Sequence, residues 1–186
     1  MRLLVALAVI VVISSLSGCV MEPVVYDQER AESVDEAIAS FREHEELAPF
    51  FSEALAYAIF PSNWRAGGGF GGAFGNGWLF EKGEVTGRAL MTEVFVGVNL
   101  GVQADRKILF FRTEGPLDQF KRGRFEFTGQ ANAAIAKTGK AVTPGYHPDV
   151  AMFVQVRGGL LLEVSVGTQR YDFFPLVPET DNTEED

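Results

Sequence analysis

The sequence predicts an α+β domain in which an N-terminal helical layer packs on a glycine-rich, mostly antiparallel β-sheet that its glycines allow to curl. Apolar residues recur at helical spacing over residues 33–58, which is typical of an amphipathic helix. From residue 65 onward, short apolar stretches alternate with glycines, as in antiparallel strands joined by short turns. The 186 residues, 47% apolar and 22% charged, suit a single domain.

The first 19 residues have the order of a bacterial lipoprotein signal. Arg2 gives a positive start, and residues 3–13 form an unbroken apolar run. That run is shorter than the roughly 20 residues that span a bilayer, but it suits the core of a signal peptide. The sequence Leu-Ser-Gly-Cys at residues 16–19 is similar to the lipobox, whose cysteine is acylated. The alternative is an ordinary secretion signal with an incidental cysteine.

A lipoprotein signal makes Cys19 the expected lipidation site and the N-terminus of the mature chain. Residues 1–18 are then the signal peptide and residues 19–32 a tether without periodicity. Acyl chains anchor a protein because each buried methylene contributes about 0.8 kcal/mol. Val20 stands where an aspartate would favour retention in the inner membrane. We therefore expect the periplasmic face of the outer membrane.

The expected helical region begins at residues 33–36, Ser-Val-Asp-Glu, which match a capping box. Acidic side chains occupy its polar side. Pro49 predicts either a kink or two separate helices. The dipeptide Phe60-Pro61 is expected to end the region.

The glycine-rich part of the chain predicts a sheet interrupted by one short helix. The expected strands are residues 78–80, 89–100, 107–112, 125–136, 150–156 and 160–166. The last two are expected to form a hairpin around Gly158 and Gly159. Thr113, as N-cap, and Gly123, at the C-terminal end, delimit the helix. The domain thus covers residues 33–178, and residues 179–186 are expected to be an acidic, disordered tail.

The net charge of −9 comes from the two ends of the chain. Residues 47–178 contain 13 basic and 11 acidic residues. Acidity of this kind argues against nucleic-acid binding, which depends on neutralising phosphates. The basic run at residues 121–124 is either a solvated face or a patch for lipid phosphates.

The residue types that carry catalysis or bind metals are scarce. One cysteine and two histidines can form neither an intramolecular disulfide nor a Cys/His zinc site. His44 and His147 are expected on the surface, with no nucleophile beside them. Residues 67–72 match the dinucleotide motif in form, but no helix is expected after them, so close backbone packing explains the glycines. We expect no catalytic residue, metal or cofactor, and hence no enzyme.

Four aromatic residues stand within or beside the glycine-rich stretch. They are Trp64, Phe70, Phe74 and Trp78. Such residues are either part of the core or an exposed aromatic loop that enters a membrane interface.

Three blocks of the sequence resemble the SYLF domain family. Residues 60–77, with Phe-Pro-Ser, Arg-Ala-Gly and Gly-Gly-Ala-Phe-Gly-Asn-Gly, resemble its opening block. Residues 97–103, Gly-Val-Asn-Leu-Gly-Val-Gln, resemble the second block, and residues 153–166 the third. Their order and spacing agree from about residue 51 to residue 171.

The resemblance implies a module that binds phospholipid. Eukaryotic members bind phosphoinositides and some bundle actin, whereas bacterial members are often secreted or lipid-anchored. The residues expected to contact lipid here are Arg65, Lys121, Arg122 and Arg124. We therefore expect a non-enzymatic envelope lipoprotein whose domain binds membrane phospholipid. The alternative is a structural or adaptor lipoprotein that binds an envelope protein through its acidic ends.

Overall fold

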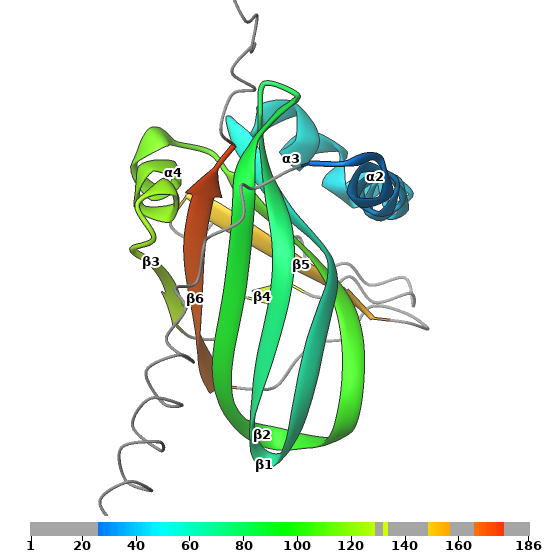
Figure 1. Cartoon of the computed structure of the whole chain (residues 1–186), viewed down its shortest axis with the longest axis vertical. Helices are drawn as coiled ribbons and strands as arrows, with labels where there is room; N and C mark the ends of the chain where they lie inside the picture. Colours follow the sequence, from blue (N-terminus) through cyan, green and yellow to red (C-terminus); the bar gives the residue numbers. More distant parts are fainter. Residues whose placement is uncertain (1–25, 129–131, 134–148, 157–165, 177–186) are drawn as a thin grey trace, which may run out of the picture.

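A computed structural model of the chain describes residues 26–128, 132–133, 149–156 and 166–176. Within these residues the helices flank a six-stranded sheet. The sheet is curled into a half-barrel (Figure 1). This confirms the predicted α+β class and the curled, mostly antiparallel sheet. The expected signal peptide, Cys19 and the expected acidic tail lie outside the described residues.

A long hairpin forms the centre of the sheet. Strand β1 (Ala56–Glu81) pairs antiparallel with β2 (Glu84–Phe111) along its whole length. The two residues between them, Lys82 and Gly83, both have positive φ angles, as a tight two-residue hairpin turn requires. The residues expected to form separate strands at 89–100 and 107–112 thus belong to one strand.

The other edge of β2 pairs with two strands in succession. Strand β6 (Val166–Pro175) lies along its first part and β5 (Val150–Val156) along its last part. Strand β3 (Phe125–Thr128) then pairs with β6, and β4 (Asn132–Ala133) pairs in parallel with β5. Strand β5 matches the expected strand at residues 150–156, whereas residues 157–165, which include the expected turn and nearly all of its partner strand, lie outside the described residues.

The hairpin curls because β1 bends back on itself. The two halves of β1 lie side by side on the front of the half-barrel (Figure 1). A Cβ atom on Gly75 would lie 1.8 Å from Oδ1 of Asn63, and one on Gly71 would lie 2.3 Å from the carbonyl oxygen of Ala66. Such closeness excludes any side chain. The glycines therefore serve close backbone packing, as the sequence indicates.

The first helix, α2 (Gln28–Arg42), begins earlier than expected. Asp27 is its N-cap and accepts a hydrogen bond from the backbone N–H of Arg30. The predicted capping box at residues 33–36 is wrong, because those residues lie inside the helix. The segment between Cys19 and the helix is correspondingly shorter than the expected tether.

Pro49 marks the beginning of a second helix. A 3₁₀ turn, η1 (Glu45–Leu47), leads into α3 (Ala48–Glu53), in which Pro49 occupies the first turn. A proline there removes no hydrogen bond, since the first N–H groups of a helix have no partner within it. Of the two alternatives that the sequence left open, two separate helices are therefore the correct one. None of the described helices is long and apolar enough to cross a membrane.

The expected helical region ends too late, because residues 56–60 begin strand β1. Both faces of the strand are buried here. Ala58 and Phe60 lie in one core cluster and Ile59 in the other. A strand buried on both sides is continuously apolar and cannot be distinguished from a helix by its pattern alone.

Two clusters of buried residues hold the fold together. The first fills the half-barrel and includes Leu117 and Phe120 of α4 (Glu114–Lys121). That helix follows Thr113 and ends before Gly123, which has a φ of 64°, so the predicted short helix is confirmed. The second cluster contains both helical and strand residues: Val34, Ala37, Phe41, Leu47, Phe50, Ile59, Trp78, Phe80, Ile108, Phe110, Ala151 and Phe153.

Candidate functional site

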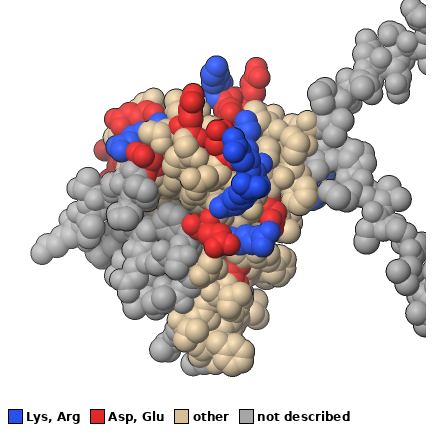
Figure 2. All heavy atoms as spheres, turned by 90° about the vertical axis from the view of Figure 1, so that its left-hand side faces the viewer, with Lys and Arg blue, Asp and Glu red and all other residues tan. Residues whose placement is uncertain are grey.

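The bent end of the β1–β2 hairpin carries no charged side chain on its outer face. Neither residues 66–80 of β1 nor residues 94–104 of β2 include a charged residue. Figure 2 shows acidic and basic side chains gathered over the upper part of one face, while its lower end lacks them. This end of the hairpin is therefore the least polar part of that face.

Large apolar side chains project from this end into solvent. Six of them are between 51% and 78% exposed: Trp64, Phe70, Phe74, Val94, Val96 and Val102. We call these six residues the apolar patch. Of the four aromatic residues noted in the sequence, only Trp78 belongs to the core, being 4% exposed.

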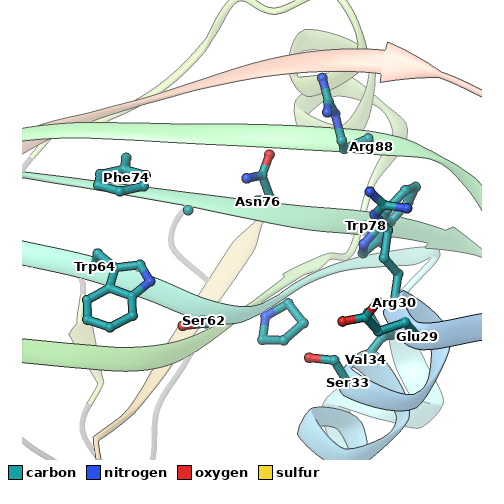
Figure 3. Close-up of a pocket in the computed structure, with 12 residues that line it drawn as sticks. Glu29, Arg30, Ser33, Val34, Ser62, Trp64, Phe74, Asn76, Trp78 and Arg88 are labelled. Carbon is teal, nitrogen blue, oxygen red and sulfur yellow. The ribbon is translucent and has the colours of Figure 1, made fainter. Parts of the chain in front are cut away.

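The patch is continuous across the sheet. Phe70 stands directly opposite Val96, and Val94 stands opposite Gly72, between Phe70 and Phe74 along the neighbouring strand. Trp64 and Phe74 line the same groove (Figure 3). Contiguous exposed apolar patches are rare on soluble proteins and mark surfaces that contact a partner or a membrane.

A groove lies beside the patch, between α2 and the outer face of the hairpin (Figure 3). Its volume is about 480 Å³, which is within the usual range for small-molecule sites. It is lined by Glu29, Arg30, Ser33, Val34, Pro61, Ser62, Trp64, Phe74, Gly75, Asn76, Trp78 and Arg88. The groove thus joins charged groups to the aromatic side chains of the patch.

Inside the half-barrel, a network of buried charged and polar groups lies in addition to the apolar core. Nη2 of Arg65 lies 2.9 Å from each carboxylate oxygen of Glu93. Nζ of Lys107 lies 3.6 Å from Oε2 of Glu93. Nδ2 of Asn63 donates a hydrogen bond of 2.9 Å to Oδ1 of Asp105. All five side chains are buried, so each depends on the others for compensation of its charge or polarity.

Burial shifts the titration of the groups in this network. It raises the pKa of the Asp105 carboxyl and lowers the pKa of the Lys107 ammonium, because both charged forms lose their hydration. The nearby phenol of Tyr171 has a pKa well above its usual value for the same reason. Its hydroxyl donates a hydrogen bond of 2.6 Å to Oε1 of Gln169. These contacts explain the network as a structural feature of the interior.

The four residues expected to contact lipid do not form one site. Arg65 is 3% exposed and faces the interior, so its guanidinium is not presented to a membrane. Lys121, Arg122 and Arg124 are exposed together at the end of α4. Lys121 pairs with Glu81 at 2.9 Å and Arg122 lies 3.7 Å from Asp118, so acidic groups compensate much of their charge.

The two histidines were the remaining candidates for catalysis or metal binding. His44 is half-buried just before η1, whereas His147 lies outside the described residues. Within the described part of the chain, no group of three His, Cys, Asp or Glu residues is placed to hold a metal ion.

No family model matches this chain, and no curated protein matches it. The resemblance to the SYLF domain therefore stays a prediction. The features of the chain that bear on function are the apolar patch, the groove and the predicted lipoprotein signal at residues 1–19. Three valines of the patch, Val94, Val96 and Val102, were not among the residues predicted to be exposed. The signal that could have identified Val94 and Val96 is their alternation along β2 with the buried Glu93 and Phe95.

Proposed function

We propose that this protein is a non-enzymatic lipoprotein of the bacterial envelope whose domain binds the phospholipid bilayer through the apolar patch. The observation that carries the proposal is the charge-free end of the hairpin with its six exposed apolar side chains. Removing such side chains from water is favourable by about 25 cal/mol per Å². Trp64 suits this position because tryptophan is enriched at membrane interfaces.

The proposed anchor favours a membrane over other apolar partners. Tyr26 follows Cys19 by seven positions, so an extended chain reaches at most about 25 Å between them. The ring of Tyr26 contacts Trp78 with their centroids 4.7 Å apart, and Trp78 lines the same groove as Trp64 and Phe74. An acyl anchor on Cys19 would therefore hold this side of the domain close to the bilayer.

The proposal includes the finer expectations from the sequence. We propose that α2, η1 and α3 form a layer over the face of the sheet opposite the first core cluster. We also propose that the chain is related to the SYLF family and lies at the periplasmic face of the outer membrane. Lys121, Arg122 and Arg124 would add a weak attraction to anionic lipids, since each base near such a surface contributes about 1 kcal/mol at most.

Vesicle co-sedimentation tests the proposal. Residues 20–186, which lack the anchor but include both core clusters, are mixed with neutral and anionic vesicles over a series of salt concentrations. We expect binding to both, with little dependence on salt. Phe70→Ser combined with Val96→Ser should weaken binding at least about tenfold, because two anchoring side chains lose their apolar surface.

The matched control reverses charge instead of removing apolar surface. A triple variant with Lys121→Glu, Arg122→Glu and Arg124→Glu should lose only the part of the binding that salt screens. No sedimentation with any vesicle at any salt concentration would contradict the proposal. The adaptor alternative would then be examined by pull-down from envelope extracts.

A further inference from the structure

We propose that the groove between α2 and β1 holds the headgroup of one zwitterionic phospholipid, with its phosphate at Arg88 and its ammonium group at Glu29. This inference rests on the proposed membrane function and specifies the lipid that the same surface takes. It follows from the polarity of the groove and from two charged side chains that have no ion-pair partner within the described structure.

The groove changes from charged to aromatic along its length (Figure 3). Glu29 and Arg88 lie toward one end, whereas Trp64 and Phe74 lie toward the other. The aromatic end belongs to the apolar patch and so continues into the surface proposed to meet the bilayer. A ligand that fits both ends has a charged head and an apolar tail, which is the chemistry of a lipid.

Arg88 supplies the site for the phosphate. Its guanidinium makes no ion pair with any described residue, unlike that of Arg30, which pairs with Asp27. It packs over the ring of Phe174 at 5.1 Å, and its buried Nε has no hydrogen-bond partner among the described residues. Because Arg88 lines the groove and no described acidic group compensates its charge, a phosphate oxygen would supply the missing partner through a charge-assisted hydrogen bond to the guanidinium.

Glu29 selects a zwitterionic headgroup over a purely anionic one. It is exposed in the first turn of α2 and forms no ion pair with any described residue. A headgroup with only negative charge would be repelled by this carboxylate. A headgroup that joins a phosphate to an ammonium group has an opposite charge for both Arg88 and Glu29.

The tryptophans make occupancy of the groove measurable. The chain has two, Trp64 and Trp78, and both line the groove, so intrinsic fluorescence reports binding there. Residues 20–186 are titrated with short-chain phosphatidylethanolamine or phosphatidylglycerol, each below the concentration at which it forms micelles. We expect a saturable change with both, and at least about tenfold tighter binding of the ethanolamine lipid, which is the effect of one charged contact.

Three substitutions separate the roles. Arg88→Gln should weaken the binding of both lipids at least about tenfold. Glu29→Gln, on an exposed helical turn, should abolish the preference between them. Lys82→Gln is the control, because Lys82 is exposed in the hairpin turn, lies outside the groove and has no ion pair within the described structure, and it should change neither. Thermal unfolding shows whether the Arg88 variant still folds.

Three results would overturn the inference. They are the absence of a saturable change with any phospholipid, an unchanged preference in the Glu29→Gln variant, and inorganic phosphate that binds as tightly as the lipid, which would indicate a site for free anions. The Phe70→Ser and Val96→Ser variant distinguishes the two proposals, since neither residue lines the groove. It should lose vesicle binding and keep the titration with single lipids. Vesicle binding without any saturable titration would contradict the lipid site in the groove and leave membrane binding by the apolar patch standing.

Discussion

Glu93 joins two buried cations inside the half-barrel. Its carboxylate contacts the guanidinium of Arg65 and lies near the ammonium of Lys107. These residues come from both halves of the hairpin, so the network ties the bent strands together. Because 28 positions separate Arg65 from Glu93, nothing in the local sequence identified the pair. Arg65 was therefore interpreted as a surface base, and the burial of a strand inside a curl could not be foreseen.

The Glu93→Gln substitution should strongly destabilise the fold. It leaves Arg65 and Lys107 buried without the carboxylate that compensates them, and breaking a buried ion pair in this way costs about 3–5 kcal/mol. Urea unfolding measures the change in the free energy of unfolding. Glu84→Gln, at an exposed position beside the hairpin turn, is the control and should have almost no effect. Equal stability of the two variants would show that the network contributes nothing.

Asp105 should give the stability a defined pH dependence. Burial raises the pKa of its carboxyl above the ordinary value of 3.8, so the folded state holds this proton more tightly than the unfolded state. The stabilisation is complete below pH 3.8 and is lost as the pH rises through the folded pKa. The Asp105→Asn variant has an uncharged side chain at every pH, so its stability does not fall in this way as the pH rises. The stability of the variant relative to the natural chain should therefore rise as the pH is raised above 3.8.

Urea unfolding of both chains at a series of pH values makes this comparison. Subtracting the two free energies of unfolding cancels the contribution of every carboxylate that both chains contain. A relative stability that falls as the pH rises would mean that the folded pKa of Asp105 lies below its unfolded value.

Strand β1 is the element on which the shape of the molecule depends. Its glycines let one half of the strand pass closely beside the other, and this bend carries the apolar patch to one end. The sequence indicated close packing at the glycines but not the length of β1 and β2, because a glycine-rich stretch usually separates strands. The pairing of β5 and β6 with β2 was also not predictable, since contacts between distant strands leave no local pattern.

Gly75→Ala tests the bend. The new Cβ would lie 1.8 Å from the side-chain oxygen of Asn63, so either the strand or the Asn63–Asp105 hydrogen bond must shift. We expect a loss of about 1–3 kcal/mol in the free energy of unfolding. Gly68→Ala is the matched control in the same strand, because nothing lies within 4 Å of its Cβ position. Similar stabilities of the two variants would argue against the close approach.

At the scale of the whole molecule, the features that point to function lie on one side. The groove, the aromatic part of the patch and the first described residue, Tyr26, adjoin one another. On the face drawn in Figure 2, charged side chains gather over the upper part, and the lower end lacks them. The sequence predicted an anchor and left open whether the aromatic residues belong to the core or are exposed. It could not show that bending the hairpin would join them into a continuous surface, since this requires the register of β1 and β2.

The depth to which Phe70 enters the bilayer tests the central proposal most directly. Phe70→Trp, in a chain with Trp64→Phe and Trp78→Phe, places a single fluorophore at the bent end of the hairpin, where Phe70 is 78% exposed. A second chain has its single tryptophan at Glu84→Trp, beside the turn that joins β1 to β2 and so at the opposite end of the hairpin. Brominated acyl chains in the vesicles should quench the first tryptophan and not the second. Equal quenching of both, or none at position 70, would contradict insertion of the apolar patch.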